Sequence, residues 1–310
     1  MEKPVKHSTP SVLISGGSGI VGRYLTSLLL ERGYKVAHLS RGVNQFGKVR
    51  VFRWNPEKGI LDPEFLKGVD YLVHLAGANL DGGPWTKRRR RRIYESRVKA
   101  ARLLYDTVQA NGISLKAFIS ASGVGYYGSF TSEKIFREED PPGAGFLGNL
   151  CREWEETADL FGSSGVRTVK IRTAPILEKT FSGLSKLIVP VKFGIVLRLG
   201  SGSQYMPWIH ISDLSNIYLR AIEDESFGGA YNAVAPQHVT HEEFMRTLAK
   251  VMKRPVFLPS VPSFVVKAFT GELGDVILKG SRVLPERILK TGYQFTFSNL
   301  RDALTDIVRS

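Results

Sequence analysis

The sequence predicts an α/β fold with a doubly wound parallel sheet and a smaller, mostly helical C-terminal lobe. Two observations predict it. Short apolar segments alternate with helical periodicity through roughly the first 175 of the 310 residues, which is typical of a parallel sheet covered by helices on both faces. The first apolar segment ends in a glycine-rich turn that leads directly into a helix, as in the phosphate-binding turn of a Rossmann-type sheet.

The elements can be assigned in chain order from this periodicity. Strands are expected at 12–15, 35–40, 49–54, 71–75, 117–121, 168–171 and 231–234. Helices are expected at 19–32, 63–67, 86–111, 149–161, 240–252 and 298–308, and another follows 208–214 with Ser212 or Asp213 as its N-cap. We therefore expect residues 1–175 to form a nucleotide-binding domain, completed by about 208–235, and 176–207 and 236–310 to form a substrate-side lobe.

Bulk composition bounds the class of protein. Apolar residues make up 43% of the chain and charged residues 23%, as in a soluble globular protein. The single cysteine, Cys151, excludes an intrachain disulfide, and the histidines show no paired metal spacing, so we expect no metal. The N-terminus lacks the apolar segment of a secretory signal, and the longest apolar stretch, 187–199, is too short to span a bilayer. We expect a cytoplasmic protein that does not enter a membrane.

The chain is strongly basic. Its 43 basic and 29 acidic residues give a net charge of +14, which favours anionic partners. The run 87–92, KRRRRR, is the obvious candidate for a nucleic-acid patch, but it opens a helix capped by Thr86, so its side chains point nearly all the way round. No aromatic residues interleave to stack bases. A solvated first turn or a subunit contact in a homodimer is therefore favoured, and one arginine can still reach a cofactor phosphate.

The glycine turn is the candidate phosphate site. A turn that feeds a helix N-terminus presents free backbone N–H groups and the positive end of the helix dipole, which together suit a pyrophosphate. The residues expected to contact it are Gly16, Gly17, Ser18, Gly19, Ile20 and Val21. A second predicted strand closes a βαβ unit of the required length.

The end of the second strand indicates which nicotinamide cofactor is bound. An acidic residue there would accept hydrogen bonds from the ribose of NAD, whereas this strand ends in Ser40 and Arg41. A guanidinium pairs with phosphate oxygens, so we expect NADP(H). Trp54 can cover the adenine, with a packed core indole as the alternative. Leu75, Ala76 and Gly77 lack bulk where the ribose and nicotinamide approach.

Several motifs together resemble a known family. GGSGIVG, HLAG at 74–77, SASGVGYYG at 120–128 and WIHISDL at 208–214 are similar to the extended short-chain dehydrogenase/reductase superfamily. PWT, ESRV at 95–98, CREWEE at 151–156, GSGSQYMPWIHISDL at 200–214 and VLPERILKTGYQF at 283–295 resemble its epimerase-like members, formerly labelled cell-division inhibitors or sugar-nucleotide epimerases. The resemblance spans nearly the whole chain and includes a short C-terminal domain of unassigned function.

The resemblance implies a tyrosine acid/base, a lysine four residues later and a serine. The Tyr-x-x-x-Lys window here runs from Leu147 to Cys151, so both residues are absent. Ser122 follows the fifth strand at the serine position, and Tyr126 or Tyr127 can replace the missing acid, although a structural role for either tyrosine is equally open. We expect Cys151 to be a buried structural residue.

The resemblance also suggests substrate contacts. Gln204 and Trp208 are expected to line the pocket, and His210 is a possible base whose alternative is a hydrogen-bonded structural histidine. Nucleotide-sugar epimerases carry a diphosphate-binding arginine at a position that is Met206 here. The favoured hypothesis is an NADP(H)-dependent oxidoreductase for a small carbonyl or alcohol. The alternatives are an NADPH-binding regulator without turnover and a sugar-nucleotide epimerase.

Overall fold

A seven-stranded parallel sheet forms the centre of the molecule in this computed structural model, which describes residues 9–309 except 43–46, 48, 81–82, 130, 181 and 258. Its strands are β1 (Ser11–Ser15), β2 (Lys35–Ser40), β3 (Arg50–Arg53), β4 (Tyr71–His74), β5 (Ala117–Gly123), β7 (Arg167–Thr173) and β11 (Gly229–Ala233). They lie in the order β11-β7-β5-β4-β1-β2-β3. The chain reverses direction across the sheet between β1 and β4, so the expected doubly wound fold is confirmed.

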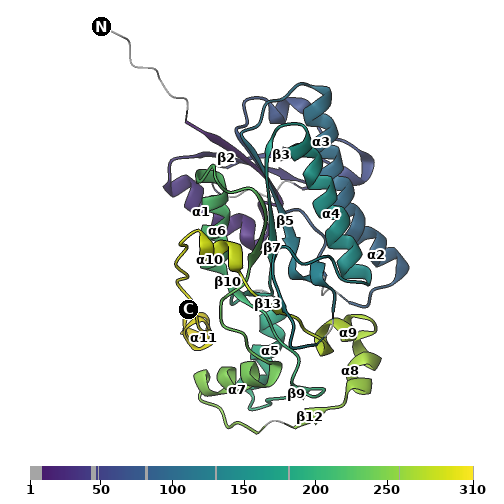
Figure 1. Ribbon diagram of the computed structural model, residues 1–310, viewed down its shortest axis with the longest axis vertical. Helices are drawn as coiled ribbons and strands as arrows, with labels where there is room; N and C mark the ends of the chain where they lie inside the picture. Colours follow the sequence, from purple (N-terminus) through teal and green to yellow (C-terminus); the bar gives the residue numbers. More distant parts are fainter. Residues whose placement is uncertain are drawn as a thin grey trace.

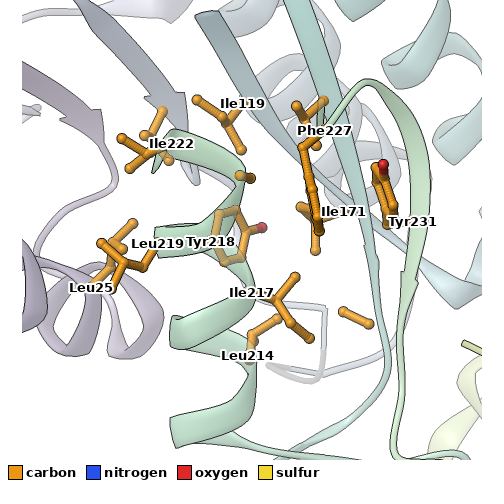
Figure 2. Close-up of a cluster of buried hydrophobic side chains, with 14 of the residues drawn as sticks. Leu25, Ile119, Ile171, Leu214, Ile217, Tyr218, Leu219, Ile222, Phe227 and Tyr231 are labelled. Carbon is orange, nitrogen blue, oxygen red and sulfur yellow. The ribbon is translucent and has the colours of Figure 1, made fainter. Parts of the chain in front are cut away.

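Helices cover both faces of the sheet (Figure 1). On one face α1 (Ile20–Glu31) packs against α6 (Ile211–Glu223). On the other face lie α3 (Ala100–Ala110) and α4 (Phe146–Ser163). Figure 2 shows Leu25 of α1 facing Leu219 of α6, while Tyr218 turns toward the sheet residue Ile171. This apolar core between the helices and the sheet follows from the same periodicity of apolar residues that predicted the elements.

The expected helix 86–111 is interrupted. Thr86 caps α2 (Lys87–Tyr94) as expected, because its side chain accepts a hydrogen bond from Arg89 N–H at 3.3 Å. A π-helical turn, Glu95–Lys99, then separates α2 from α3. Such turns are rare and occur frequently at functional sites.

Helix α6 begins earlier than expected. Neither Ser212 nor Asp213 is its N-cap; His210 is, and its ring accepts a hydrogen bond from the Ser212 N–H. The reason is the short strand β10 (Ile209–His210), which pairs with β8 (Ile176–Leu177) and ends directly at the helix. The extended backbone of His210 therefore stands where a cap belongs.

The C-terminal part is mostly helical, as expected. Helix α7 (His241–Val251) begins with a capping box formed by Thr240 and Glu243. The other helices of this part are α5 (Ser182–Lys192), α8 (Ser263–Thr270), α9 (Leu273–Leu278), α10 (Glu286–Lys290) and α11 (Leu300–Arg309). Short parallel pairs join distant segments: β6 (Ile135–Phe136) with β13 (Arg282–Val283), and β9 (Arg198–Leu199) with β12 (Ser260–Val261). Sequence patterns missed α5, which contains Pro190, and also α8, α9 and α10.

Two features are absent from the described part of the chain. None of its helices combines the length and hydropathy that crossing a bilayer requires. No group of three histidine, cysteine or acidic side chains in it is arranged to hold a metal ion.

Asp213 joins α6 to the C-terminal segment. Its side chain is fully buried and accepts hydrogen bonds from Thr296 N–H at 2.8 Å, Phe297 N–H at 3.0 Å and the Tyr293 hydroxyl at 3.2 Å. We expect Asp213→Ala to lower the free energy of unfolding by about 2–4 kcal/mol, because the buried N–H and O–H donors lose their acceptor. Urea unfolding measures this change in the free energy of unfolding. Asp106→Ala, which removes an exposed pair with Arg102, should change it by only about 0.5 kcal/mol, and an equal effect would contradict the assignment.

His74, at the end of β4, is a buried neutral imidazole. Its Nε2 lies 3.3 Å from the Arg97 carbonyl, which can only accept, so Nδ1 accepts from the Ser15 hydroxyl at 2.7 Å. Burial lowers the pKa of His74 to about 4, well below the value of an unfolded chain. The unfolded state then binds the extra proton between about pH 6.5 and pH 4, so stability falls as the pH is lowered through this window.

We expect this histidine to contribute up to about 3 kcal/mol to that acid destabilisation, with His241, whose pKa burial also lowers to about 4, acting in the same direction. Urea unfolding at several pH values measures the slope. His74→Asn should flatten it by nearly one proton. A variant with the wild-type slope would show that His74 does not control it.

Candidate nucleotide-binding and catalytic site

The glycine turn between β1 and α1 is pressed against two neighbouring strand ends. Gly16 has a φ of +78°, and a Cβ there would lie 2.8 Å from the Ala76 backbone nitrogen, beyond β4. A Cβ on Gly17 would lie 2.3 Å from the ring of His38 in β2. A Cβ on Gly22 would lie 2.6 Å from the Gly16 carbonyl oxygen. Glycine is therefore required here for close backbone packing.

The N-terminus of α1 carries no side-chain cap. Gly19 stands at the N-cap position, and the first turn contains no acidic residue. The first helical hydrogen bond runs from Arg23 N–H to the Gly19 carbonyl at 2.9 Å, so the N–H groups of the preceding first-turn residues remain available. Ser18 and Gly19 are exposed and Ile20 and Val21 half-buried. The turn fits a diphosphate, with the helix dipole favouring its charge.

A basic corner lies beyond β2. The Arg41 side chain is 55% exposed. It pairs with Glu57 at 3.3 Å, a surface ion pair too weak to immobilise it. Ser40 is half-buried and pairs in register with Arg53 of β3. Arg53, like Arg41, is exposed. The corner thus offers two guanidinium groups. Sequence reasoning missed Arg53, because its position depends on the register of β3 against β2.

Trp54 does not meet the expectation that it covers an adenine. It is 3% exposed and belongs to the core cluster that contains Leu39 and Leu66, so packing leaves its indole no free face. Leu75 and Ala76 are half-buried after β4, and Gly77 is exposed. These three residues lie beside the glycine turn, as the contact between Gly16 and Ala76 shows.

A buried ion pair takes up two of the three candidate catalytic residues. Glu155 of α4 accepts hydrogen bonds from Arg172 Nε and Nη2, both at 2.8 Å, and from the Ser122 hydroxyl at 2.7 Å. Arg172 Nη1 donates to the Tyr127 hydroxyl at 2.9 Å, and that hydroxyl donates to Asn232 at 2.7 Å. Tyr127 is fully buried, and burial raises its pKa. The Tyr127 hydroxyl and the Ser122 proton are therefore both engaged inside the core, which favours the structural alternative for Tyr127.

Tyr126 is arranged differently. It is half-buried, with its ring stacked 3.5 Å from the Arg172 guanidinium and edge-on to Tyr127. Burial raises the pKa of Tyr126, and the Arg172 charge opposes that shift. Of the three candidates, Tyr126 alone keeps part of its side chain outside the core.

The segment of α4 from Leu147 to Cys151, which lacks the tyrosine and the lysine, lies beside the Glu155–Arg172 network. Cys151 is buried beside Gly123, as expected, and burial raises the pKa of its thiol to about 12, so it is un-ionised at neutral pH. The positive charge next to it comes from the π-helical turn, because Arg97 acts electrostatically on the Cys151 thiol. Sequence reasoning named neither Arg97 nor the Glu155–Arg172 pair. The only signal for Arg97 and Glu155 was their place in the motif segments ESRV and CREWEE, and Arg172 lies in none of the segments.

The expected substrate residues lie in the C-terminal core. The segment containing them runs beside 235–241, with hydrogen bonds from Met206 N–H to Val239 and from Ala235 N–H to Trp208. This pairing turns Trp208 into the interior, where it is 1% exposed. Gln204 is also buried and donates to the Leu199 carbonyl at 3.0 Å. The pocket-lining expectation for both is therefore not met in this arrangement.

His210 is likewise structural. Besides capping α6, its ring packs 3.9 Å from Phe297, and its Nε2 lies 3.3 Å from Asp306. Burial lowers its pKa, although Asp306 opposes the shift. This arrangement favours the alternative of a hydrogen-bonded structural histidine, and the role of His210 as a base stays a prediction.

Arginines of the basic run have separate contacts. Arg89 donates to the Asn79 carbonyl at 2.8 Å, Arg90 pairs with Glu272 beside α9, and Arg91 pairs with Glu95 at 3.0 Å. Arg88 and Arg92 are exposed. The run forms no single basic stripe.

Comparison with known proteins agrees with this architecture. Residues 12–146 match the model of the NAD dependent epimerase/dehydratase family, and 261–307 match a domain of unknown function (DUF1731). The mouse epimerase family protein SDR39U1 is 37% identical over 302 residues, covering 96% of this chain and 99% of that protein. YfhF of Bacillus subtilis, also an epimerase family protein, is 32% identical, covering 96% and 98%.

Solved structures give the same result. The crystal structure of human SDR39U1 (isoform 2) with NADPH is similar with a TM-score of 0.86 at 32% identity, covering 96% of this chain and 99% of that one. UDP-N-acetylglucosamine 4-epimerase from Bacillus cereus, at 16% identity and a TM-score of 0.76, shares the fold. The chain therefore belongs to the epimerase family of extended short-chain dehydrogenases/reductases that includes the SDR39U1 proteins and ends in a DUF1731 domain.

Proposed function

We propose that this protein is an NADP(H)-dependent oxidoreductase acting on a small carbonyl or alcohol. The observation that carries the proposal is the uncapped N-terminus of α1 beside an exposed guanidinium at the end of β2. The NADPH in the similar human crystal structure supports the same cofactor. The division into a nucleotide-binding part, 1–175 with 208–235, and a substrate-side lobe belongs to this proposal.

Different groups of residues would bind the different parts of the cofactor. The backbone N–H groups of the residues that follow Gly16 and Gly19 would hold the diphosphate. Arg41 and Arg53 would hold the 2′-phosphate. The backbone of Leu75, Ala76 and Gly77 after β4 would lie along the ribose and nicotinamide end. When bound, NADP(H) would supply or accept the hydride.

At the reacting end, Tyr126 would exchange a proton with the substrate oxygen. The Arg172 guanidinium below its ring favours the phenolate form and so opposes the effect of burial on the pKa. The Ser122 oxygen, fixed by Glu155, would help to position the substrate hydroxyl as an acceptor. The buried side of the cluster, which includes Tyr127 and Cys151, keeps water from this edge of the sheet.

One observation favours a second function. Ser122 and Tyr127 are committed to the buried network, and the tyrosine–lysine pair is absent, as in a protein that binds NADPH without turnover. Monitoring NADPH absorbance across a carbonyl panel separates the two: tight binding without consumption supports the regulator. Sugar-nucleotide epimerisation is less well supported, since Met206 stands where a diphosphate-binding arginine is expected; one similar structure, 30% identical, is nevertheless called a nucleoside-diphosphate sugar epimerase.

Arg41→Asp tests cofactor choice. We expect NADPH affinity to fall by about 10- to 100-fold, because a charge-assisted phosphate contact is replaced by repulsion, while NADH affinity changes little. Quenching of protein fluorescence gives both dissociation constants. Arg301→Asp, on the exposed side of α11, is the matched charge control. Equal wild-type affinity for the two cofactors would reject the role of Arg41.

Tyr126→Phe tests the proton donor. The ring and its stacking on Arg172 remain, so NADPH affinity should stay within about threefold, while turnover of an active carbonyl substrate should fall by about 10²–10⁴-fold. Tyr127→Phe should instead lower thermal stability, because Asn232 and Arg172 lose their partner. Undiminished turnover in Tyr126→Phe would assign the proton to another group.

A further inference from the structure

Arg97 occupies an unusual place in the fold. It lies in the π-helical turn Glu95–Lys99, and its side chain runs back over Gly77 after β4. Nη1 donates to the carbonyls of Ala78 at 3.0 Å and Ile93 at 3.3 Å. A Cβ on Gly77 would lie 2.8 Å from the guanidinium carbon, so any other residue there would displace the guanidinium from this position. The guanidinium is thus held in one position at the strand edge.

The charge of Arg97 is not balanced by a carboxylate. Within the described residues no acidic side chain lies at ion-pair distance from it, whereas Arg91 and Lys99 both pair with Glu95, at 3.0 and 2.8 Å. Burial is strong enough to lower the pKa of Arg97 to about 10, which still leaves it charged at neutral pH. A partly buried cation without a counter-charge attracts an anion, so this position is a candidate binding site.

One edge of this guanidinium has no protein acceptor. Nη1 is occupied by carbonyls, while no described group accepts a hydrogen bond from Nε or Nη2. These two nitrogens lie over Gly77, 3.2 and 3.0 Å from where a Cβ would stand. Together they form the fork that binds carboxylate or phosphate oxygens in pairs.

The surroundings place this fork at the reacting end of the site. The Arg97 charge acts on the Cys151 thiol, and that thiol interacts with Ser122 at the end of β5. Trp154 lies 5.4 Å from the guanidinium carbon and forms an apolar floor. The low dielectric of such a floor strengthens an ion pair made above it.

We propose that Arg97 binds an anionic oxygen of the substrate, a carboxylate or phosphate, so that the protein acts on acidic carbonyl or hydroxy compounds. This inference rests on the proposed oxidoreductase function. The same chemistry is offered by the phosphates of the cofactor, and the experiment must therefore separate the two sources.

The test uses the full chain saturated with NADPH and two probes, oxalate and inorganic phosphate, in thermal-shift titrations. A ligand that binds the folded state raises the melting temperature with its concentration. We expect wild type to respond to at least one probe, and Arg97→Gln to need at least tenfold more of it. Arg97→Lys, which keeps the charge without the fork, should lie between them. Arg92→Gln removes an exposed charge from the neighbouring helix and should match wild type.

NADPH affinity distinguishes the sources. Arg97→Gln should bind NADPH within threefold of wild type. A tenfold loss of NADPH affinity would assign Arg97 to the cofactor and overturn the proposal. So would equal anion responses in Arg97→Gln and Arg92→Gln, or no response in a wild type that binds NADPH. A wild type that binds no NADPH would instead refute the proposed function.

Discussion

The buried pair of Arg172 and Glu155 is the interaction on which the candidate site depends. It joins β7 to α4, and through Ser122 and Tyr127 it also holds the end of β5 and the turn after it. Both side chains are about 5% exposed or less, so each charge needs the other. Breaking such a pair from one side typically costs about 3–5 kcal/mol, since the remaining charge stays buried.

That pair also limits what the edge of the sheet can do chemically. The candidate residues Ser122 and Tyr127 both form hydrogen bonds within this buried network. The helix segment that faces them holds Leu147 and Cys151 where the superfamily has tyrosine and lysine. The groups left facing outward are Tyr126, above the Arg172 guanidinium, and Arg97, above Gly77. Chemistry in this protein is therefore expected to use a phenol and a guanidinium on different elements.

The guanidinium groups of Arg172 and Arg97 lie in different electrostatic environments. Arg172 is neutralised inside the core and acts by position, whereas Arg97 is desolvated without a carboxylate and keeps two donors uncommitted. Arg97 lies in the π-helical turn, and its guanidinium reaches Gly77 after β4, whereas Arg172 lies on β7. His74 supports that turn by donating to the Arg97 carbonyl.

The sequence by itself determined the parallel sheet, its glycine turn and the helices around it, because apolar periodicity and the need for glycine are local properties of the chain. Gly16, Gly17 and Gly22 stand where any side chain would meet a neighbour. Only the tertiary structure decided which polar residues are free. Tyr126 and Tyr127 are adjacent in sequence, yet one is sealed in the core. Trp54, Trp208 and His210 are packed inside, and Arg53 and Arg97 are brought to the edge. Burial and pairing depend on contacts between segments far apart in the chain, which no local pattern records.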